Sequence, residues 1–561
     1  MPRQNTWDAI VVGSGITGGW AAKELCERGL RTLVLEAGPA IDPASDYVEH
    51  VPAWSMRYRG MGDRRQLDRD QPIQKLCYAC DEWAARFFVN DREHPYTHPP
   101  DQPFAWIRGR QVGGRSLLWY RQVYRWSDLD FEANARDGHG VDWPIRYADL
   151  APWYDHVERF IGVSGQAEGL SQLPDGPFLP PMEMNCAEEV VRQAMARRWG
   201  RGRVLTIGRS AVLTRPHLGR EACHYCGPCH RGCVTGSFFS SLSATLPAAE
   251  ATGRLTLRPG SVVHSLVHDE RSNRISGVRV IDADTAATRE FRGRLVFLCA
   301  STLESTRLLL NSHTSRFPDG LANSSGALGH YLMDHTMAHG ATGVIPGFER
   351  HTMKGSRPNG VYVPRFRNAT EPHDGFVRGY AFQGDALPRF WRRPLAGAGP
   401  GFKRALLEES GPWTMTLEGY GECLPRSDNF VALDPVATDK WGIPALRIHC
   451  SYGPNERAQM EDMIVTATEI LEEAGATDIQ PMRDTLIPGL VIHEMGTARM
   501  GRDPRTSVLN GWNQAHDIPN LFVTDGACMA SSANQNPSLT YMALTARAAA
   551  HAVDLLDRRE L

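Results

Sequence analysis

The first forty residues contain the pattern that most constrains the fold. Asp8-Ala-Ile-Val-Val12 is a short apolar run that leads into the glycine turn Gly13-Ser-Gly15-Ile-Thr-Gly18. A helical segment then connects this turn to a second apolar run, Leu33-Val-Leu-Glu36. A strand, glycine turn, helix and strand in this order form the βαβ unit that holds a dinucleotide. The sequence therefore predicts a dinucleotide-binding domain at the start of the chain.

Each glycine of the turn has a separate physical task. The first permits the tight turn, the second lets the backbone approach a pyrophosphate, and the third lets the helix pack closely on the strand. The free N–H groups and the positive dipole end of the helix then face the phosphates. The residues expected to surround the phosphates are Gly13, Ser14, Gly15, Ile16, Thr17 and Gly18.

A carboxylate ends the second strand. Glu36 lies 18 residues after Gly18 and is placed to accept hydrogen bonds from a ribose 2′-OH, and Ala37 follows it instead of an arginine that would accommodate a 2′-phosphate. A glycine turn alone is a weak signal, and the alternative is a glycine-rich turn that binds nothing. The two strands, the helix and the acid together favour the dinucleotide.

Length and composition restrict the class of protein. A chain of 561 residues exceeds one simple core, so two or more domains are expected. The net charge of -3 and the isoelectric point near 6.7 argue against a nucleic-acid partner. No apolar run reaches the roughly 18 residues of a membrane-spanning helix, and no direct membrane insertion is expected. The first strand begins within a few residues of Met1, so we expect no signal peptide and folding in the cytoplasm.

The remaining patterns divide the chain into five parts. The dinucleotide-binding domain is expected to comprise residues 1–215 and 241–330, with a cysteine-rich loop at 216–240 between them. Alternating strands near 254–281 lead to an apolar strand at 295–299 and a helix from 302 to 310, which is a second βα unit.

The later parts have a different pattern. Residues 331–492 carry scattered strands and one long helix at 454–474, which predicts a substrate domain on a mainly antiparallel sheet. Residues 493–561 hold a strand that ends in Asp525-Gly526 and a long helix from Pro537 to Leu556, expected to return to the first domain. The predicted fold class is thus a Rossmann-like α/β domain with an interleaved α+β substrate domain.

A second glycine turn occurs at Arg110-Gln-Val-Gly113-Gly114-Arg-Ser116. Paired glycines let a backbone approach a bound group, although an ordinary turn fits this pattern as well.

The cysteine-rich loop has the sharpest spacing in the chain. Cys223-His-Tyr-Cys226-Gly-Pro-Cys229-His-Arg-Gly-Cys233 has the C-x2-C-x2-C-x3-C spacing that bacterial ferredoxins use for an iron–sulfur cluster, with Val234 in place of the proline that follows there. A [4Fe-4S] or [3Fe-4S] cluster is therefore expected at these thiols. The alternative is zinc, which usually takes its ligands from two separated cysteine pairs, not from 11 residues. Disulfide bonds between these cysteines would need an oxidising compartment, and the N-terminus is not expected to direct the chain to one.

Two late segments together indicate alcohol oxidation. They are His493-Glu-Met-Gly-Thr-Ala-Arg-Met-Gly501 and Asn534-Gln-Asn536-Pro-Ser-Leu-Thr540. Removing a hydride from a carbinol requires its hydroxyl proton to leave as well, and a neutral imidazole can accept that proton near neutral pH. An amide can hold the same oxygen while charge develops on it. His493 and Asn536 are therefore the candidate catalytic residues.

These motifs together resemble the glucose-methanol-choline (GMC) oxidoreductase family over nearly the whole chain. The resemblance implies a glutathione-reductase-like fold with FAD along the first βαβ unit, His493 as base and Asn536 as its partner. It also implies that Glu36 binds the adenosine ribose and that the backbone of Val263 contacts the adenine. Asp525 and Gly526 would lie near the flavin and its ribityl chain. Further FAD contacts implied by the matching motifs are Ala37, Arg110, Val112, Gly113, Gly114, Ser116, Ala300, Asn536, Pro537 and Ser538.

Within that family, the cysteine loop ahead of Gly236-Ser-Phe-Phe-Ser240 is similar to the catalytic subunits of bacterial glucoside 3-dehydrogenases and levoglucosan dehydrogenases. Two positions depart from the family pattern. Leu118 stands where pyranose oxidases attach FAD through a histidine, which implies non-covalent FAD. Ala300-Ser301 stands where Ala-Gly is usual.

The resemblance implies a dehydrogenase that oxidises a secondary alcohol of a sugar, at C3 of a glucoside or of an anhydrosugar such as levoglucosan. Electrons would leave through the cluster to a protein acceptor such as a c-type cytochrome. A small accessory subunit with an export signal would carry the folded chain to the periplasm. The alternatives are an oxidase that uses O2 and holds structural zinc, and a non-catalytic flavin and iron–sulfur electron-transfer subunit.

Overall fold

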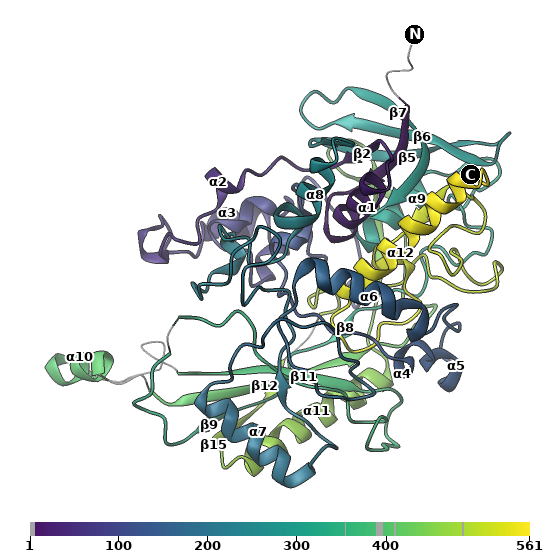
Figure 1. The fold of residues 1–561 in the computed structure, drawn as a ribbon. Coiled ribbons are helices and arrows are strands. Elements are labelled where there is room, and N and C mark those ends of the chain that lie inside the picture. The colour runs from purple at the N-terminus through teal and green to yellow at the C-terminus, as the bar shows by residue number, and fades with distance from the viewer. Residues whose placement is uncertain (1–5, 354, 389–396, 409–410, 485–486) are drawn as a thin grey trace.

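Two seven-stranded sheets organise the part of the chain that the structure describes (Figure 1). The structure is a computed structural model, and it describes residues 6–353, 355–388, 397–408, 411–484 and 487–561. Residues 1–5, which enter the expectation about a signal peptide, lie outside these ranges. Within the described ranges, no helix is long and apolar enough to span a membrane.

The first sheet contains the predicted βαβ unit. Its strands run in the order β4-β2-β1-β7-β6-β5, and β16 pairs with β7. β1, β2, β4, β7 and β16 pair in parallel, whereas β5, β6 and β7 form an antiparallel meander. Val12 lies level with both Leu35 and Leu298, so the strand ends that carry the glycine turn meet at one edge. The strands are β1 (Thr6–Val12), β2 (Thr32–Leu35), β4 (Leu255–Arg258), β5 (Ser261–Asp269), β6 (Arg274–Asp282), β7 (Thr288–Leu298) and β16 (Leu521–Val523).

Helices from opposite ends of the chain cover this sheet. α1 (Ile16–Glu27) packs against α12 (Ser538–Asp557), as Figure 1 shows in purple and yellow. The buried face of α12 is rich in alanine, and small side chains permit such a close approach. α6 (Tyr147–Ile161) packs on α12, α8 (Leu246–Ala251) packs on α1, and α9 (Thr302–Asn311) contacts β5. β16 pairs with β7 and α12 packs on α1, so the last strand and helix lie with the first sheet.

The second sheet is antiparallel, as predicted. Its order is β15-β9-β12-β11-β10-β3, and β8 pairs with β12. Along β12, the residues Trp413, Met415 and Leu417 are buried against α7 and α11, while the alternate residues face the other way, toward the first domain. Its elements are β3 (Thr206–Ile207), β8 (His335–Thr336), β9 (His339–Ile345), β10 (Val361–Val363), β11 (Tyr380–Pro388), β12 (Trp413–Glu422), β15 (Thr477–Arg483), α7 (Cys186–Trp199) and α11 (Pro454–Glu473).

Two segments cross the predicted domain boundaries. α7 and β3 belong to the second sheet, although the sequence assigned residues 1–215 to the first domain. The apolar side chains of α7, such as Val191 and Met195, share a core with β11 and β12, a contact that no local pattern reveals. Conversely, the hairpin of β13 (Phe430–Thr438) and β14 (Pro444–His449) lies in the predicted substrate domain but packs on α9 of the first.

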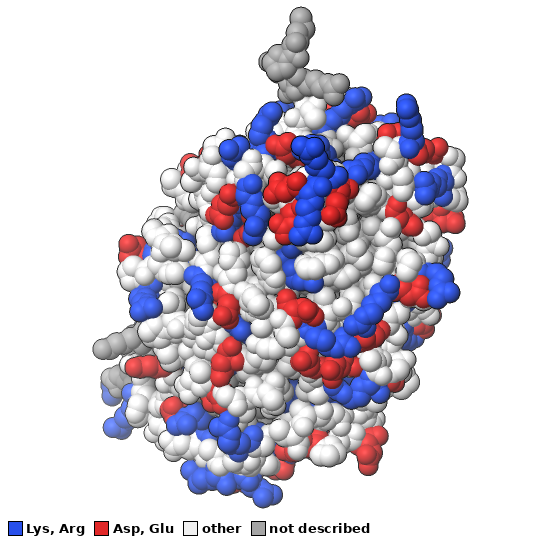
Figure 2. Space-filling model, turned by 45° about the vertical axis from the view of Figure 1, so that its right-hand side comes forward, with Lys and Arg blue, Asp and Glu red and all other residues white. Residues whose placement is uncertain are grey.

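Short helices and the surface complete the fold. The other α-helices of the described residues are α2 (Pro43–Asp46), α3 (Arg64–Asp70), α4 (Asp128–Phe131), α5 (Ala133–Asp137) and α10 (Gly399–Glu408). Figure 2 shows basic and acidic side chains interspersed over the face that it draws. Mixed charge of this kind produces no strong field of one sign for steering a charged ligand to that face.

Candidate active site

One large cavity lies between the two sheets. It has a volume of about 880 Å³ and is lined by the glycine turns, by β11 and β12, by the late histidine and asparagine segments, and by part of the cysteine-rich loop. A volume of this size is typical of cofactor sites. The cavity thus brings together the glycine turns predicted to bind a dinucleotide and the two segments that hold the candidate catalytic residues.

The first glycine turn is shaped as its sequence predicts. Gly13 adopts φ +95°, and a Cβ there would lie 2.5 Å from the carbonyl oxygen of Cys299. A Cβ on Gly18 would lie 2.0 Å from the carbonyl oxygen of Gly13, so this position must be glycine for the helix to approach the turn. Gly15 differs from both because a Cβ there would meet nothing within 4 Å, and it lines the cavity. Space is therefore left where a pyrophosphate would approach the backbone.

The carboxylate of Glu36 holds the two glycine turns together. Its Oε2 accepts hydrogen bonds from the backbone N–H of Ser14 at 3.1 Å and from the Ser14 hydroxyl at 2.6 Å, and Oε1 accepts one from Gly38 N–H at 2.9 Å. The Ser14 Oγ in turn accepts a hydrogen bond from Gly113 N–H at 3.0 Å. Burial raises the pKa of Glu36. Glu36 and Ala37 both line the cavity, as the ribose prediction requires.

The end of the crevice beside Glu36 fits an adenosine, because the start of β5 lies there and Ser261 N–H donates to the carbonyl oxygen of Glu36 at 2.8 Å. Val263 lines it where the register of β5 with β6 shifts between Val263 and Ser265, which leaves backbone groups free there. The Asn311 side-chain nitrogen, which lines the same end, is buried and has no hydrogen-bond partner among the described residues. A buried polar atom without a partner indicates a polar ligand. The residues present therefore fit FAD.

Most predicted cofactor residues line the cavity, but three do not. Those that line it are Gly13, Ser14, Gly15, Ile16, Thr17, Glu36, Ala37, Arg110, Gly114, Ser116, Val263, Ala300, Asp525, Gly526, Asn536, Pro537 and Ser538. Gly18, Val112 and Gly113 lie behind the surface. Gly18 packs on the turn, Val112 is buried in the core beneath, and Gly113 adopts φ +90° to shape the second turn.

The departure at Ala300-Ser301 has a structural explanation. Ser301 adopts φ +82°, which is the backbone region that glycine enters most easily. The Ser301 hydroxyl accepts a hydrogen bond from Arg115 Nη2 at 2.8 Å. A serine therefore keeps the glycine-like conformation and gains a side-chain contact.

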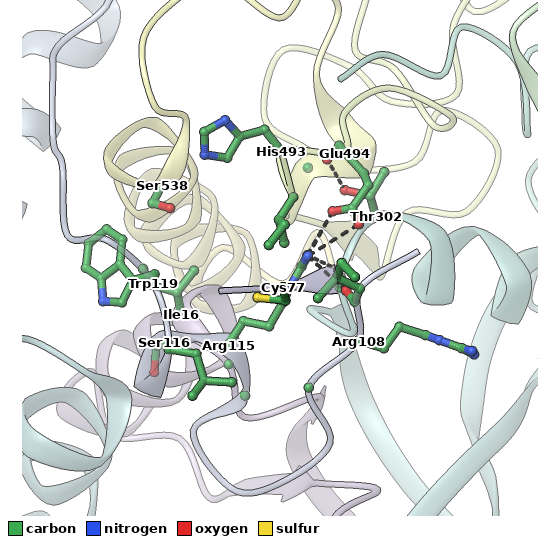
Figure 3. Close-up of a pocket in the computed structure, with 18 of the residues that line it drawn as sticks. Ile16, Cys77, Arg108, Arg115, Ser116, Trp119, Thr302, His493, Glu494 and Ser538 are labelled. Atoms are coloured by element: carbon green, nitrogen blue, oxygen red, sulfur yellow. Dashed lines mark hydrogen bonds and ion pairs between the residues drawn. The ribbon is translucent and has the colours of Figure 1, made fainter. Parts of the chain in front are cut away.

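Arg115 and Glu494 form an ion pair beside His493. Arg115 Nη2 lies 3.0 Å from Glu494 Oε2, and Figure 3 shows this pair beneath His493. Burial opposes the charge of Arg115, but the Glu494 carboxylate outweighs it and raises the pKa of the guanidinium. Nearby, burial raises the pKa of Asp525 to about 6, and the Asp525 carboxylate accepts hydrogen bonds from the Ser305 hydroxyl and from Ala527 N–H.

The structure places the two candidate catalytic residues side by side. His493 Nε2 lies 3.4 Å from Asn536 Nδ2, and the Asn536 Oδ1 accepts a hydrogen bond from Gln383 Nε2 at 2.6 Å. Burial lowers the pKa of His493 well below its ordinary value, with further lowering from His335 and Arg115. The imidazole is therefore neutral at neutral pH and can accept a proton.

Two residues that the sequence did not reveal hold His493 in place. Asp334 accepts a hydrogen bond from His493 N–H at 3.1 Å, and burial raises the pKa of this carboxyl to about 7. His335 Nδ1 lies 3.0 Å from His493 Nδ1. They precede His493 by 159 and 158 residues, so no local motif connects them to it.

A polar wall on the second sheet faces the catalytic pair. Gln383 lies opposite Glu418, and Asp385 lies opposite Thr416, on the cavity side of β11 and β12. Burial raises the pKa of both carboxyls. The sequence expected substrate contacts in residues 331–492 without naming any, and these four side chains supply groups that can bind hydroxyls.

The cysteine-rich loop borders the same cavity. Gly227, Cys229 and His230 line it, and His230 Nε2 lies 3.0 Å from Asp81. Burial and then the neighbouring thiols of Cys229, Cys233 and Cys223 raise the pKa of Cys226 to about 11. However, among the described residues no three His, Cys, Asp or Glu side chains are arranged to hold a metal ion. In the part of the chain that the structure describes, the four cysteines of the loop therefore do not form a ligand shell.

Comparison with known proteins agrees with this site. The model of the GMC oxidoreductase N-terminal region matches residues 7–337, and that of the C-terminal region matches residues 425–545. The chain is 30% identical to a 2-methyl-1,2-propanediol dehydrogenase of Mycolicibacterium austroafricanum, over 98% of this chain and 95% of the relative. It is 27% identical to the fructose dehydrogenase large subunit of Gluconobacter japonicus, over 97% of each chain.

A solved structure supports the fold independently. The pyridoxine 4-oxidase of Mesorbium loti superposes with a TM-score of 0.63 at 17% identity, covering 98% of this chain and 99% of that one. At this identity the likeness concerns the fold alone. Taken with the matches along the sequence and with the dinucleotide crevice, it shows that the chain belongs to the GMC oxidoreductase family, as an FAD-dependent enzyme that acts on CH–OH groups.

Proposed function

We propose that this enzyme is a dehydrogenase that oxidises a secondary alcohol of a sugar, at C3 of a glucoside or of an anhydrosugar such as levoglucosan, to the 3-keto sugar. The observation that carries the proposal is the position of His493 and Asn536 opposite a wall of hydroxyl-binding side chains in the FAD cavity. A ring that carries several hydroxyls matches such a wall better than a simple alcohol does.

The residues of the chain divide the work of oxidation. His493 Nε2 accepts the hydroxyl proton, and the Asn536 side-chain N–H groups hold the oxygen while charge develops on it. Asp385, Thr416 and Glu418 orient the ring through its other hydroxyls. The chemistry that bound FAD supplies is acceptance of the hydride from the carbinol carbon. Leu118 lines the cavity and has no nucleophilic atom, in keeping with non-covalent FAD.

The proposal also includes a route for electrons out of the protein. The thiols of Cys223, Cys226, Cys229 and Cys233 suit a [4Fe-4S] or [3Fe-4S] cluster by ligand type and spacing. Cys229 lines the FAD cavity, so a cluster bound to it would lie beside the cofactor from which it takes electrons. The acceptor would be a protein such as a c-type cytochrome. The fructose dehydrogenase relative is named a large subunit, which supports a further, small subunit here.

The same four thiols permit a second candidate, an oxidase that uses O2 and holds structural zinc in this loop, because zinc also takes four cysteine ligands. This enzyme would release hydrogen peroxide during turnover. The fold likeness to pyridoxine 4-oxidase is compatible with either candidate.

The decisive experiment is a cofactor assay on protein purified without air. Iron, acid-labile sulfide, zinc and FAD are quantified per polypeptide. We expect iron with matching sulfide beside one releasable FAD, and loss of iron in Cys229→Ser but not in the control Cys77→Ser, which lies outside the loop. Zinc without sulfide, together with peroxide formation, would overturn the dehydrogenase in favour of the oxidase.

The proposed small subunit leads to a further proposal, that the chain is exported together with it. The chain would be folded and loaded in the cytoplasm and carried to the periplasm with its small subunit. Fractionation of cells that express the neighbouring genes tests this, and recovery of the chain in the cytosolic fraction alone would contradict it.

A further inference from the structure

We propose that His335 is a positioning residue that fixes the tautomer of His493, so that the lone pair of His493 Nε2 faces the substrate hydroxyl. The inference rests on the proposed role of His493 as the base. His335 itself contacts neither substrate nor cofactor in this scheme and acts through His493.

The structure fixes His335 firmly. It is fully buried at the start of β8, where it pairs with Glu422 of β12, and its carbonyl oxygen accepts a hydrogen bond from the Tyr452 hydroxyl at 2.9 Å. Its ring Nε2 lies 3.1 Å from the carbonyl oxygen of Ser532. A carbonyl oxygen can only accept, so Nε2 must carry the hydrogen. In the neutral ring, Nδ1 is then a bare acceptor.

This acceptor determines the state of His493. The two Nδ1 atoms are 3.0 Å apart, and the ring planes are inclined by 79°, so that one ring points its nitrogen at the other. Only one of the two nitrogens can carry the shared hydrogen. Because His335 Nδ1 is bare, His493 Nδ1 donates, and His493 Nε2 keeps its lone pair.

Asn536 supports the same assignment from the other side. Its Oδ1 is occupied by the Gln383 amide, so its Nδ2 is the atom that faces His493 Nε2 at 3.4 Å. An amide nitrogen only donates, so it favours a bare Nε2, but at 3.4 Å the contact is longer than an ordinary hydrogen bond and does not fix the tautomer by itself. Hydrogen-bond donation therefore has one direction along these side chains. Gln383 donates to Asn536, which donates to His493. His493 in turn donates to His335, which donates to the carbonyl oxygen of Ser532.

The opposite arrangement is unfavourable. If His493 Nδ1 were bare, His335 would need hydrogens on both ring nitrogens and would carry a positive charge. Burial lowers the pKa of His335 to about 4, which excludes that charge at neutral pH. When the hydroxyl proton moves to His493 Nε2, the Nδ1–H of the resulting cation still has the His335 lone pair as its acceptor.

The test compares two substitutions of similar size. His335→Asn keeps an acceptor oxygen close to the position of Nδ1, whereas His335→Leu removes it. The tautomer is read directly from long-range 1H–15N spectra of the FAD-loaded protein labelled at histidine, with the His493 signals assigned by their loss in His493→Gln. We expect the Nδ1–H form of His493 in the wild type and in His335→Asn, and the Nε2–H form in His335→Leu.

Anaerobic flavin reduction by a sugar alcohol gives the second readout. We expect His335→Leu to lower the limiting rate about 100-fold, with the concentration for half-saturation nearly unchanged and His335→Asn largely restored. His339→Leu, which removes another buried histidine, is the control with unchanged rate. An Nε2–H wild type, or the same His493 tautomer in His335→Leu, would overturn the inference. A fully active His493→Gln would instead overturn the proposed base and leave the tautomer result standing.

Discussion

At the residue scale, the buried His335 ties the stability of the protein to pH. Its pKa is about 4 in the folded protein and roughly 6.5 in an unfolded chain. Because folding depresses this pKa, the contribution of His335 to the free energy of unfolding is fully present above about pH 6.5 and is lost as the pH falls through about 4. The difference between the two pKa values corresponds to about 3 kcal/mol of that free energy.

His335→Asn should therefore weaken the loss of stability between about pH 6.5 and about pH 4. Urea unfolding of wild type and variant at the two ends of this range measures the difference. An equally steep fall in both proteins would show that His335 is not responsible. His493 contributes in the same direction, because burial depresses its pKa as well.

A second residue-scale prediction concerns the base itself. His493→Ala should lower the rate of anaerobic flavin reduction by a factor on the order of 100 to 10,000, because His493 is the imidazole that lies beside Asn536 in the cavity and would take the hydroxyl proton. The nucleotide crevice is built from other residues, so FAD content should stay unchanged. Stopped-flow absorbance gives the rate, and a loss of FAD in the variant would show that His493 acts by holding the cofactor.

At the element scale, the junction of β1 and α1 offers a matched pair of glycines. In Gly15→Ala the new methyl meets no protein atom within 4 Å but enters the cavity, whereas in Gly18→Ala it lies 2.0 Å from the Gly13 carbonyl oxygen. We expect Gly15→Ala to weaken FAD retention while the melting temperature of the FAD-free protein is unchanged. Gly18→Ala should lower both. Equal melting temperatures for the two FAD-free variants would contradict this assignment.

Elements with strong local signals could be predicted from the sequence. The glycine turn, α11 and α12 occur where they were expected, because glycine spacing and helical periodicity are properties of neighbouring residues. α7 was assigned to the wrong domain because its partners on β11 and β12 come from later in the chain. The strand at 295–299 is the end of a longer β7, which begins in a polar hairpin that carries little apolar signal.

The same distinction holds for the site. His493 and Asn536 could be named because each lies in a recognisable motif. Gln383 and His335 could not, since their contacts with the pair connect residues 153 and 158 positions apart. Ser301 shows a third case, in which the departure from the expected glycine was visible but its backbone conformation was not.

At the scale of the whole molecule, Arg378 connects the second sheet to the rest of the protein. It is almost completely buried, donates to Glu422 Oε1 at 2.6 Å and to Asp137 Oδ2 at 2.8 Å, and Glu422 also accepts from the backbone N–H of Ala533. Arg378→Met should lower the free energy of unfolding by about 3–5 kcal/mol, because it removes this partner from the fully buried Glu422 carboxylate and from Asp137.

Arg483→Met is the control for this prediction. Arg483 pairs with Glu461 on the surface, where water screens the charges, so its loss should leave the denaturation midpoint unchanged. Denaturant titrations of both variants provide the comparison. A similar midpoint for Arg378→Met and wild type would show that the ion pair does not hold the second sheet in place.

The pairing of β16 with β7 also fixes the order in which the enzyme can come into being. A ribosome produces β1 and β2 first, but β16, which lies beside β7 and leads into Asp525, emerges only after the whole second sheet. Asn536 and α12, which packs on α1, follow later still. The nascent chain must therefore keep an incomplete nucleotide crevice until synthesis is nearly finished. Cofactor loading is accordingly a late event, and a truncated translation product has neither a finished crevice nor a complete catalytic pair.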